Sequence, residues 1–173
     1  MNSGNKGLLG FSDHDRSVVG MRYVYPVVSR RAGGVSVGIN LNTNNACNWQ
    51  CMYCQVPGLV RGAPPPTDLL LLRDELKTFL DELINGDFMR KHVPEGLRQI
   101  RDIAFSGNGE PTSSSSLVEA VRLVGELRSS SGLTREIPIR LITNGSLMGR
   151  KNVQYAISTL GELGGEVWFK VDG

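Results

Sequence analysis

Three cysteines stand within eight residues of each other and are the only thiols of the 173-residue sequence. They are Cys47, Cys51 and Cys54, in the spacing C-x3-C-x2-C. An odd number of cysteines cannot pair off into a disulfide framework, and no signal segment at the N-terminus argues for export. Thiols clustered in this way more often bind metal or do redox chemistry. The sequence therefore predicts a metal centre held by this short segment.

Three thiolates suit an iron–sulfur cluster with one open coordination position. A [4Fe–4S] cluster is usually held by one cysteine at each iron, so three cysteines leave one iron for an exogenous ligand or substrate. Two alternatives stay open. One is a zinc site with a fourth ligand from elsewhere, although most zinc motifs present two separated cysteine pairs. The other is three unrelated buried thiols.

Two further polar turns follow apolar, strand-like segments. The turn 107–111 comes after the run 101–106, and Thr143-Asn144-Gly145 closes the run 137–143. A last strand is expected over 166–172, in which Trp168, Lys170 and Asp172 share one face. Because the opposite face is more apolar, we expect helices to cover that face and the Trp168 side to face away from them, which is the interior if the sheet closes into a barrel. An internal Lys170–Asp172 pair of structural value only is the alternative.

Alternating strands and helices are expected to position these groups. The runs 21–28 and 35–41 favour a hairpin in which Pro26 puts the first strand at an edge. A helix is expected after Thr67, which caps it, and should end at Asn85-Gly86. A capping box of Ser116 and Glu119 should start the next helix, and a third is expected over 153–163.

This alternation implies right-handed crossovers and a parallel sheet. Ligands of such sheets bind at the carboxyl ends of the strands. The cysteine segment, the turn 107–111, the turn 143–145 and Asp172 each follow a strand. We therefore expect all four to converge on one rim.

The cysteine segment resembles the signature loop of the radical S-adenosylmethionine enzymes, C-x3-C-x-aromatic-C, with Tyr53 in the aromatic place. Asn108-Gly109-Glu110-Pro111 resembles the GGEP motif of that superfamily, with Asn108 in place of the first glycine. Thr143-Asn144-Gly145 resembles its turn after the third strand. The resemblance implies an α/β fold, a partial (β/α)6 TIM-like barrel of which this chain covers about the first four strands.

The resemblance also implies a function. S-adenosylmethionine would chelate the open iron of a [4Fe–4S] cluster, whose electron would cleave it to methionine and a 5′-deoxyadenosyl radical that abstracts hydrogen from an unidentified substrate. The implied metal ligands are Cys47, Cys51 and Cys54. The implied cofactor-binding residues are Tyr53, Asn108, Gly109, Glu110, Pro111, Thr143, Asn144, Lys170 and Asp172.

Other functions stay open beside this one. The lead-in segment 25–40 and the segment 105–112 are similar to the group that contains archaeal wyosine-tRNA synthases. A tRNA-modifying enzyme is therefore one alternative, although those synthases carry extra cysteines and a net charge of +2 gives no nucleic-acid footprint. A non-catalytic electron-transfer module is another, but a carrier gains nothing from an open iron.

The domain organisation expected is an N-terminal arm and lead-in strand over 1–34, followed by a radical S-adenosylmethionine partial barrel over 35–173. A reducing partner such as a flavodoxin or ferredoxin is implied. No apolar run is long enough to cross a membrane, so a cytoplasmic protein is expected. A full (β/α)8 barrel takes about 250 residues. We therefore expect the chain to be C-terminally incomplete, and poorly soluble or unable to cleave S-adenosylmethionine alone.

Overall fold

A mostly parallel five-stranded sheet forms the centre of the computed structural model, which describes residues 20–29 and 32–170. Its strands lie in the order β1-β2-β5-β6-β7. Their bounds are Val24–Ser29, Gly34–Ile39, Ile100–Phe105, Ile139–Thr143 and Glu166–Phe169. Only the β1–β2 pair is antiparallel among these strands. The predicted α/β class with a largely parallel sheet is thus confirmed.

The hairpin at the start of this sheet is also as predicted. β1 pairs with β2 from Val24 opposite Ile39 to Ser29 opposite Gly34, and β1 has no other neighbour in the sheet. Pro26 therefore stands on an edge strand, where its missing N–H costs no ladder bond. The predicted lead-in strand belongs to the same sheet as the strands after it. The rest of the predicted arm, residues 1–19, lies outside the described residues.

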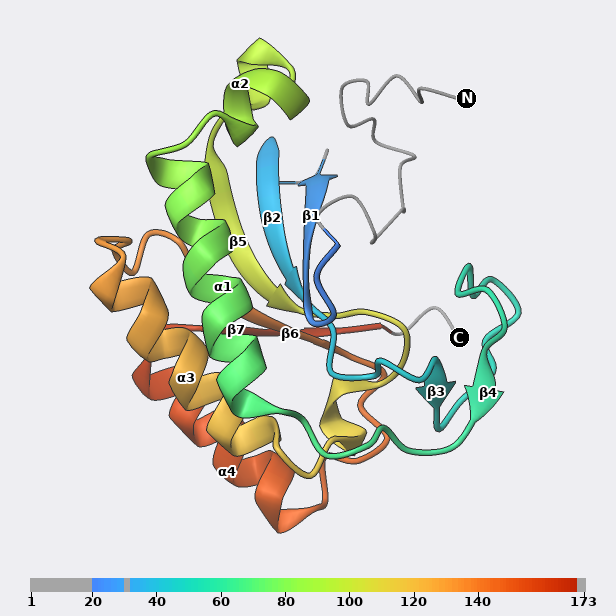
Figure 1. Cartoon of the computed structure of the whole chain (residues 1–173). Helices are drawn as coiled ribbons and strands as arrows, with labels where there is room; N and C mark the ends of the chain where they lie inside the picture. Colours follow the sequence, from blue (N-terminus) through green and yellow to red (C-terminus); the bar gives the residue numbers. More distant parts are fainter. Residues whose placement is uncertain (1–19, 30–31, 171–173) are drawn as a thin grey trace.

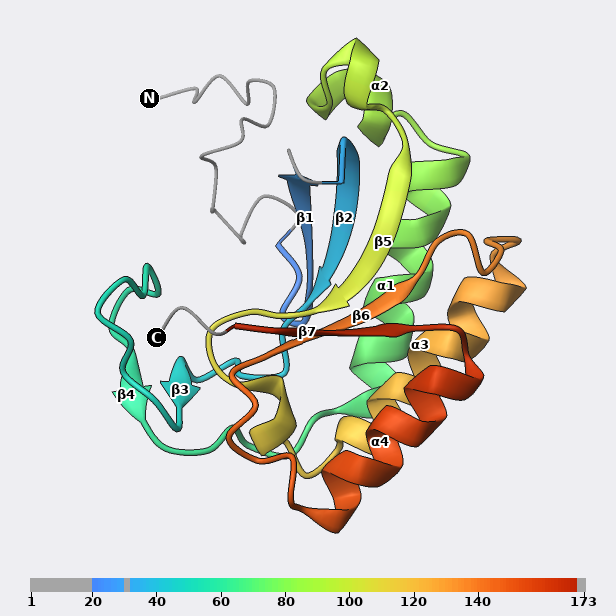
Figure 2. The same cartoon turned by 180° about the vertical axis from the view of Figure 1, so that it is seen from behind.

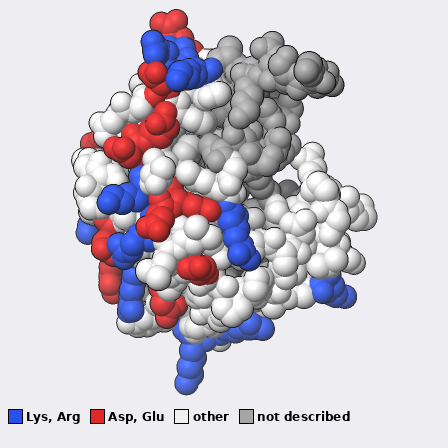
Figure 3. Space-filling view, viewed as in Figure 1, with Lys and Arg blue, Asp and Glu red and all other residues white. Residues whose placement is uncertain are grey.

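Three long helices cover one face of the sheet (Figures 1 and 2). They are α1 (Leu69–Ile84), α3 (Leu117–Ser130) and α4 (Lys151–Glu162), and the short α2 (Phe88–His92) follows α1. The apolar residues predicted to face inward are buried in one core with the sheet, among them Leu72, Leu76, Phe79, Val121, Val124, Leu127, Ala156 and Leu160. In Figure 3, acidic and basic side chains are interspersed over these helices.

The predicted helix caps were wrong in detail. Asp68, not Thr67, caps α1, because its carboxylate accepts hydrogen bonds from the backbone N–H groups of Leu70 and Leu71. Ser116 precedes α3 but makes no side-chain cap. Its hydroxyl instead accepts a 3.2 Å hydrogen bond from the backbone N–H of Thr67. The capping-box prediction failed because this long-range contact occupies the serine.

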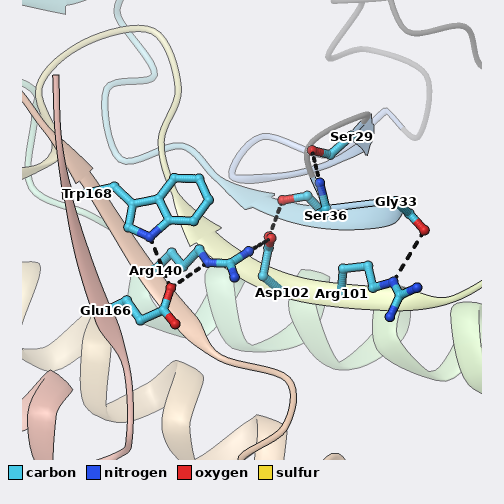
Figure 4. A network of polar contacts seen from close by, with 9 residues as sticks. Ser29, Gly33, Ser36, Arg101, Asp102, Arg140, Glu166 and Trp168 are labelled. Atoms are coloured by element: carbon cyan, nitrogen blue, oxygen red, sulfur yellow. Dashed lines mark hydrogen bonds and ion pairs between the residues drawn. The ribbon is translucent and has the colours of Figure 1, made fainter.

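The last strand is shorter than predicted. β7 ends at Phe169, and the predicted residues Val171 and Asp172 lie outside the described residues. Val167 packs against the core, whereas Trp168 lies on the face opposite the helices, as predicted (Figure 4). Phe169 belongs to the apolar side of the strand but is 54% exposed. None of the described helices is long and apolar enough to span a membrane.

Candidate functional site

The cysteine segment begins directly after β2 and is closed by a small parallel bridge. β3 (Ala46–Cys47) pairs with β4 (Val60–Arg61), so the chain between them forms a closed loop. Two backbone bonds support the bridge, from Val60 N–H to the Asn45 carbonyl and from Gly62 N–H to the Cys47 carbonyl, both 3.0 Å. Cys47 and Cys51 are half-buried and Cys54 is exposed, and all three are free thiols.

The turn after β5 presses against the start of this loop. A Cβ at Gly109 would sit closer than 3.0 Å to the Ala46 carbonyl oxygen and to the side chain of Asn42, a separation that real Cβ atoms essentially never have. Asn108 adds a side-chain bond, donating to Asn45 Oδ1 at 2.5 Å. Gly109 is therefore required by close backbone approach to the segment that carries Cys47.

Glu110 ties the turn after β5 to the turn after β6. Its carboxylate is 3% exposed. One oxygen accepts from the Thr112 N–H at 3.1 Å and from the Thr112 and Thr143 hydroxyls at 2.6 Å. The other accepts from the Asn144 N–H at 2.7 Å. Because both carboxylate oxygens are engaged inside the protein, Glu110 holds the two turns in position. A ligand at the rim would therefore contact the backbone of the turn after β5 and not the Glu110 carboxylate.

The turn after β6 reaches the cysteine loop directly. Asn144 donates from Nδ2 to Asn48 Oδ1 at 3.1 Å, and Asn48 donates from its own amide to the Ser146 hydroxyl at 2.7 Å. The Cys47 thiol is 3.8 Å from the same Asn48 oxygen. The cysteine segment and both polar turns thus meet at the carboxyl ends of β2, β5 and β6. The predicted convergence on one rim is confirmed for these three clusters.

Three other predicted site residues, Tyr53, Thr143 and Lys170, are among the described residues. Thr143 is buried and committed to Glu110, while Tyr53 is 45% exposed next to Cys54. Lys170 is held beside Thr143 by a 2.9 Å backbone bond from its N–H to the Thr143 carbonyl. Asp172, the fourth predicted cluster, lies outside the described residues.

Sequence reasoning missed the asparagines that connect the rim. Asn40 accepts from the backbone N–H of Asn108 at 3.1 Å, and Asn42 donates to the Ala46 carbonyl at 2.8 Å. Asn45 and Asn48 make the side-chain contacts to the two turns. The sequence feature that could have indicated these contacts is the high asparagine content of this segment, since five asparagines stand from position 40 to position 48.

The three thiols are not gathered into a preformed metal site. Across the described ranges, no group of three or more His, Cys, Asp or Glu side chains is placed to hold a metal ion. The loop between β3 and β4 has no further regular structure. Metal-binding loops commonly complete their folding when the metal binds. The segment suits a metal because it carries three thiols, and not because the three side chains are already close together.

The contact between Gly109 and the cysteine segment makes a stability prediction. Gly109→Ala is expected to destabilise the chain by about 1–3 kcal/mol, because the new Cβ would overpack against backbone at Ala46. Gly96→Ala is the matched control, since a Cβ there meets nothing within 4 Å. The measurement is the urea unfolding midpoint of both variants. Equal midpoints for the two would show that the close approach does not exist in solution.

Comparison with known proteins gives two partial matches. The chain is 30% identical over 132 residues to the GTPase Obg of Brachyspira hyodysenteriae, which is 75% of this chain and 16% of that protein. It is 28% identical over 131 residues to UPF0026 protein MJ1312 of Methanocaldococcus jannaschii, 75% of this chain and 35% of that protein. No protein-family model and no solved structure matches. The chain thus spans a minor part of each relative.

Neither relative supplies site residues for this chain. The printed sequence contains no G-x4-G-K-[S/T] pattern, the phosphate-binding loop that P-loop GTPases use. This chain therefore lacks the phosphate-binding residues of a P-loop GTPase. The name UPF0026 protein states no activity.

Proposed function

We propose that this chain is the cofactor-binding part of a radical S-adenosylmethionine enzyme. The observation that carries the proposal is the junction of three segments at one rim. Asn45 and Asn48 of the cysteine segment are hydrogen-bonded to Asn108 and Asn144 of the two turns. A site that must hold a thiolate-bound cofactor next to a second, polar cofactor needs this juxtaposition.

The donor set fits a [4Fe–4S] cluster. Three thiols, none of them in a disulfide, are the only cysteines of the sequence. Thiolates are soft ligands that select iron–sulfur clusters and zinc over harder cations. Cys47, Cys51 and Cys54 would hold the cluster, which when bound supplies the electron that cleaves S-adenosylmethionine so that hydrogen can be taken from a substrate.

The chain's own residues would bind and orient the second cofactor. Gly109 lets the backbone of the turn 108–111 lie against the cysteine segment, where its polar groups can meet the amino acid part of S-adenosylmethionine. Glu110 holds that turn and Asn144 in fixed relation. Tyr53, from the cysteine loop, would contact the rest of the molecule.

We further propose that the sheet is part of a (β/α)6 barrel. From β2 onward the strands lie in the sheet in their sequence order, and α1, α3 and α4 cover the same face. In a (β/α) barrel, parallel strands in sequence order curve to closure and the helices form the outer ring. The three long helices all lie on one face of the sheet, and no described helix covers the opposite face (Figures 1 and 2), which supports this architecture.

Binding of S-adenosylmethionine is the direct test. The chain is reconstituted anaerobically with iron and sulfide, reduced with dithionite, and studied by EPR. S-adenosylmethionine is expected to shift the signal of the reduced cluster, because its amino and carboxylate groups would ligate the open iron. The matched ligand is 5′-methylthioadenosine, which lacks those groups and should leave the signal unchanged. An unchanged signal at saturating S-adenosylmethionine would contradict the proposal.

A further inference from the structure

A chain of polar contacts crosses the face of the sheet opposite the helices, called the open face below (Figure 4). Ser36 of β2 donates from its hydroxyl to Asp102 of β5. Arg140 of β6 forms an ion pair with Asp102 and donates from Nε to Glu166 of β7 at 2.9 Å. Trp168 donates to the same Glu166 oxygen at 3.0 Å. Four neighbouring strands are thus linked on this face.

These contacts fix the guanidinium of Arg140. Its Cζ atom lies over the Trp168 ring, 4.4 Å from the ring centroid. Asp102 is only 4% exposed although it carries a charge, and a buried charge is tolerated only when it is paired. The hydrogen bond from Arg140 also holds the pKa of Glu166 below its usual range. A charged group held this firmly on a sheet face is suited to recognition.

A hollow of about 260 Å³ opens beside this guanidinium. Most of its wall is apolar and comes from Val27, Ala104, Ile142, Trp168 and Phe169. Its polar lining includes Ser36, Asp102, Ser106, Arg140 and Lys170. Ligand pockets for whole small molecules measure roughly 300–1,000 Å³. The hollow is therefore suited to one end of a molecule rather than to all of it.

Among the charged residues that line the hollow, the unused hydrogen-bonding groups are donors of Arg140 and Lys170. Both oxygens of Asp102 are occupied, by Ser36 and by Arg140, and one oxygen of Glu166 already accepts two bonds. A guanidinium has five N–H donors, and the contacts above use only the Nε donor and one from Nη1. Among the described residues, the Lys170 ammonium has no ion-pair partner. A ligand that satisfies these donors must bring acceptor oxygens.

We propose that the hollow binds an oxyanion, a carboxylate or a phosphate, on the substrate of this protein, with Arg140 and Lys170 as its ligands. That this anion belongs to a substrate rests on the proposed function. Binding of the anion itself does not, because it needs no cluster. Arg140 precedes Thr143 by three residues in β6, which places it about 10 Å below the rim. An anion held there would leave the other end of the substrate directed toward the cysteine segment.

The test uses the cluster-free chain with Trp168 as the reporter. The sequence has two tryptophans, so Trp49→Phe leaves Trp168 alone. Phosphate, acetate and methionine are titrated separately at constant ionic strength while the fluorescence of Trp168 is followed. We expect a saturable change with phosphate or with acetate, and the one that saturates at lower concentration identifies the oxyanion. Methionine stands for the amino acid part of S-adenosylmethionine.

Three further variants decide the outcome. Lys170→Gln and Arg140→Lys should each weaken anion binding by about tenfold, which is about 1.4 kcal/mol, because each removes a charge-assisted hydrogen bond to the anion. Arg140→Lys keeps the charge beside Asp102, so the fold is preserved while the planar fork is lost. Lys151→Gln, an exposed lysine at the start of α4, is the control and should bind as before.

Two results would overturn the proposal. One is a fluorescence change that does not saturate, or that is equal in Lys170→Gln and Lys151→Gln. The other is saturation by methionine alone, which would assign the hollow to S-adenosylmethionine itself. Because this titration needs neither iron nor reductant, its failure is distinct from failure of the EPR test above.

Discussion

Replacing Cys47, Cys51 or Cys54 with alanine is expected to remove nearly all the iron that the reconstituted wild-type chain retains. A [4Fe–4S] cluster would bring about four irons per chain, held through thiolates. Each replacement leaves two thiols in a chain that has no others. Two soft ligands on one short loop cannot hold a cluster through desalting. Iron and acid-labile sulfide are counted after anaerobic reconstitution.

Met52→Ala is the matched control for this experiment. Met52 lies between the second and third cysteines and is fully exposed, so its loss should leave the iron content unchanged. Wild-type iron and sulfide in all three cysteine variants would disprove the cluster. One zinc ion per chain with no acid-labile sulfide would instead support the zinc alternative.

Local patterns in the sequence were sufficient for the framework of the fold. Helical periodicity in 67–84 reflects which side chains face the core, and α1 has that burial. The alternation in 35–41 separates the two faces of β2, but all six residues of this strand are buried. The helix caps were mispredicted because several side chains compete for each position. Asp68 accepts the α1 N–H groups that Thr67 was expected to satisfy, and Ser116 is engaged by the distant Thr67 backbone. No local rule decides between such partners.

The rim was predictable in outline because parallel strands bring their carboxyl ends together. Its connections were not, because they join residues far apart in the sequence. Glu110 bonds to Thr143, which is 33 residues away, and Asn48 bonds to Asn144, which is 96 away. Arg140 stands between apolar neighbours in β6, and Asp102 follows Arg101 at the start of the apolar part of β5. That these two residues form an ion pair follows only from the register of the strands.

Glu110→Ala is expected to destabilise the chain by about 3 kcal/mol, without any cofactor present. The carboxylate is buried and accepts four hydrogen bonds from Thr112, Thr143 and Asn144. Its removal leaves buried donors unsatisfied, each of which costs roughly 1–3 kcal/mol unless water enters. The free energy of unfolding is measured by urea titration.

Glu110→Gln separates the loss of hydrogen bonds from the loss of volume. The amide keeps one acceptor oxygen, which can still receive Thr112 and Thr143, but its NH₂ group would face the N–H of Asn144. The loss should therefore be intermediate, at about 1–2 kcal/mol. Glu162→Ala, which removes an exposed carboxylate at the end of α4, should leave the unfolding midpoint nearly unchanged. If Glu110→Ala and Glu162→Ala unfold at the same urea concentration, the two turns are not joined through Glu110 in solution, and the rim would then have to be held together by its asparagines.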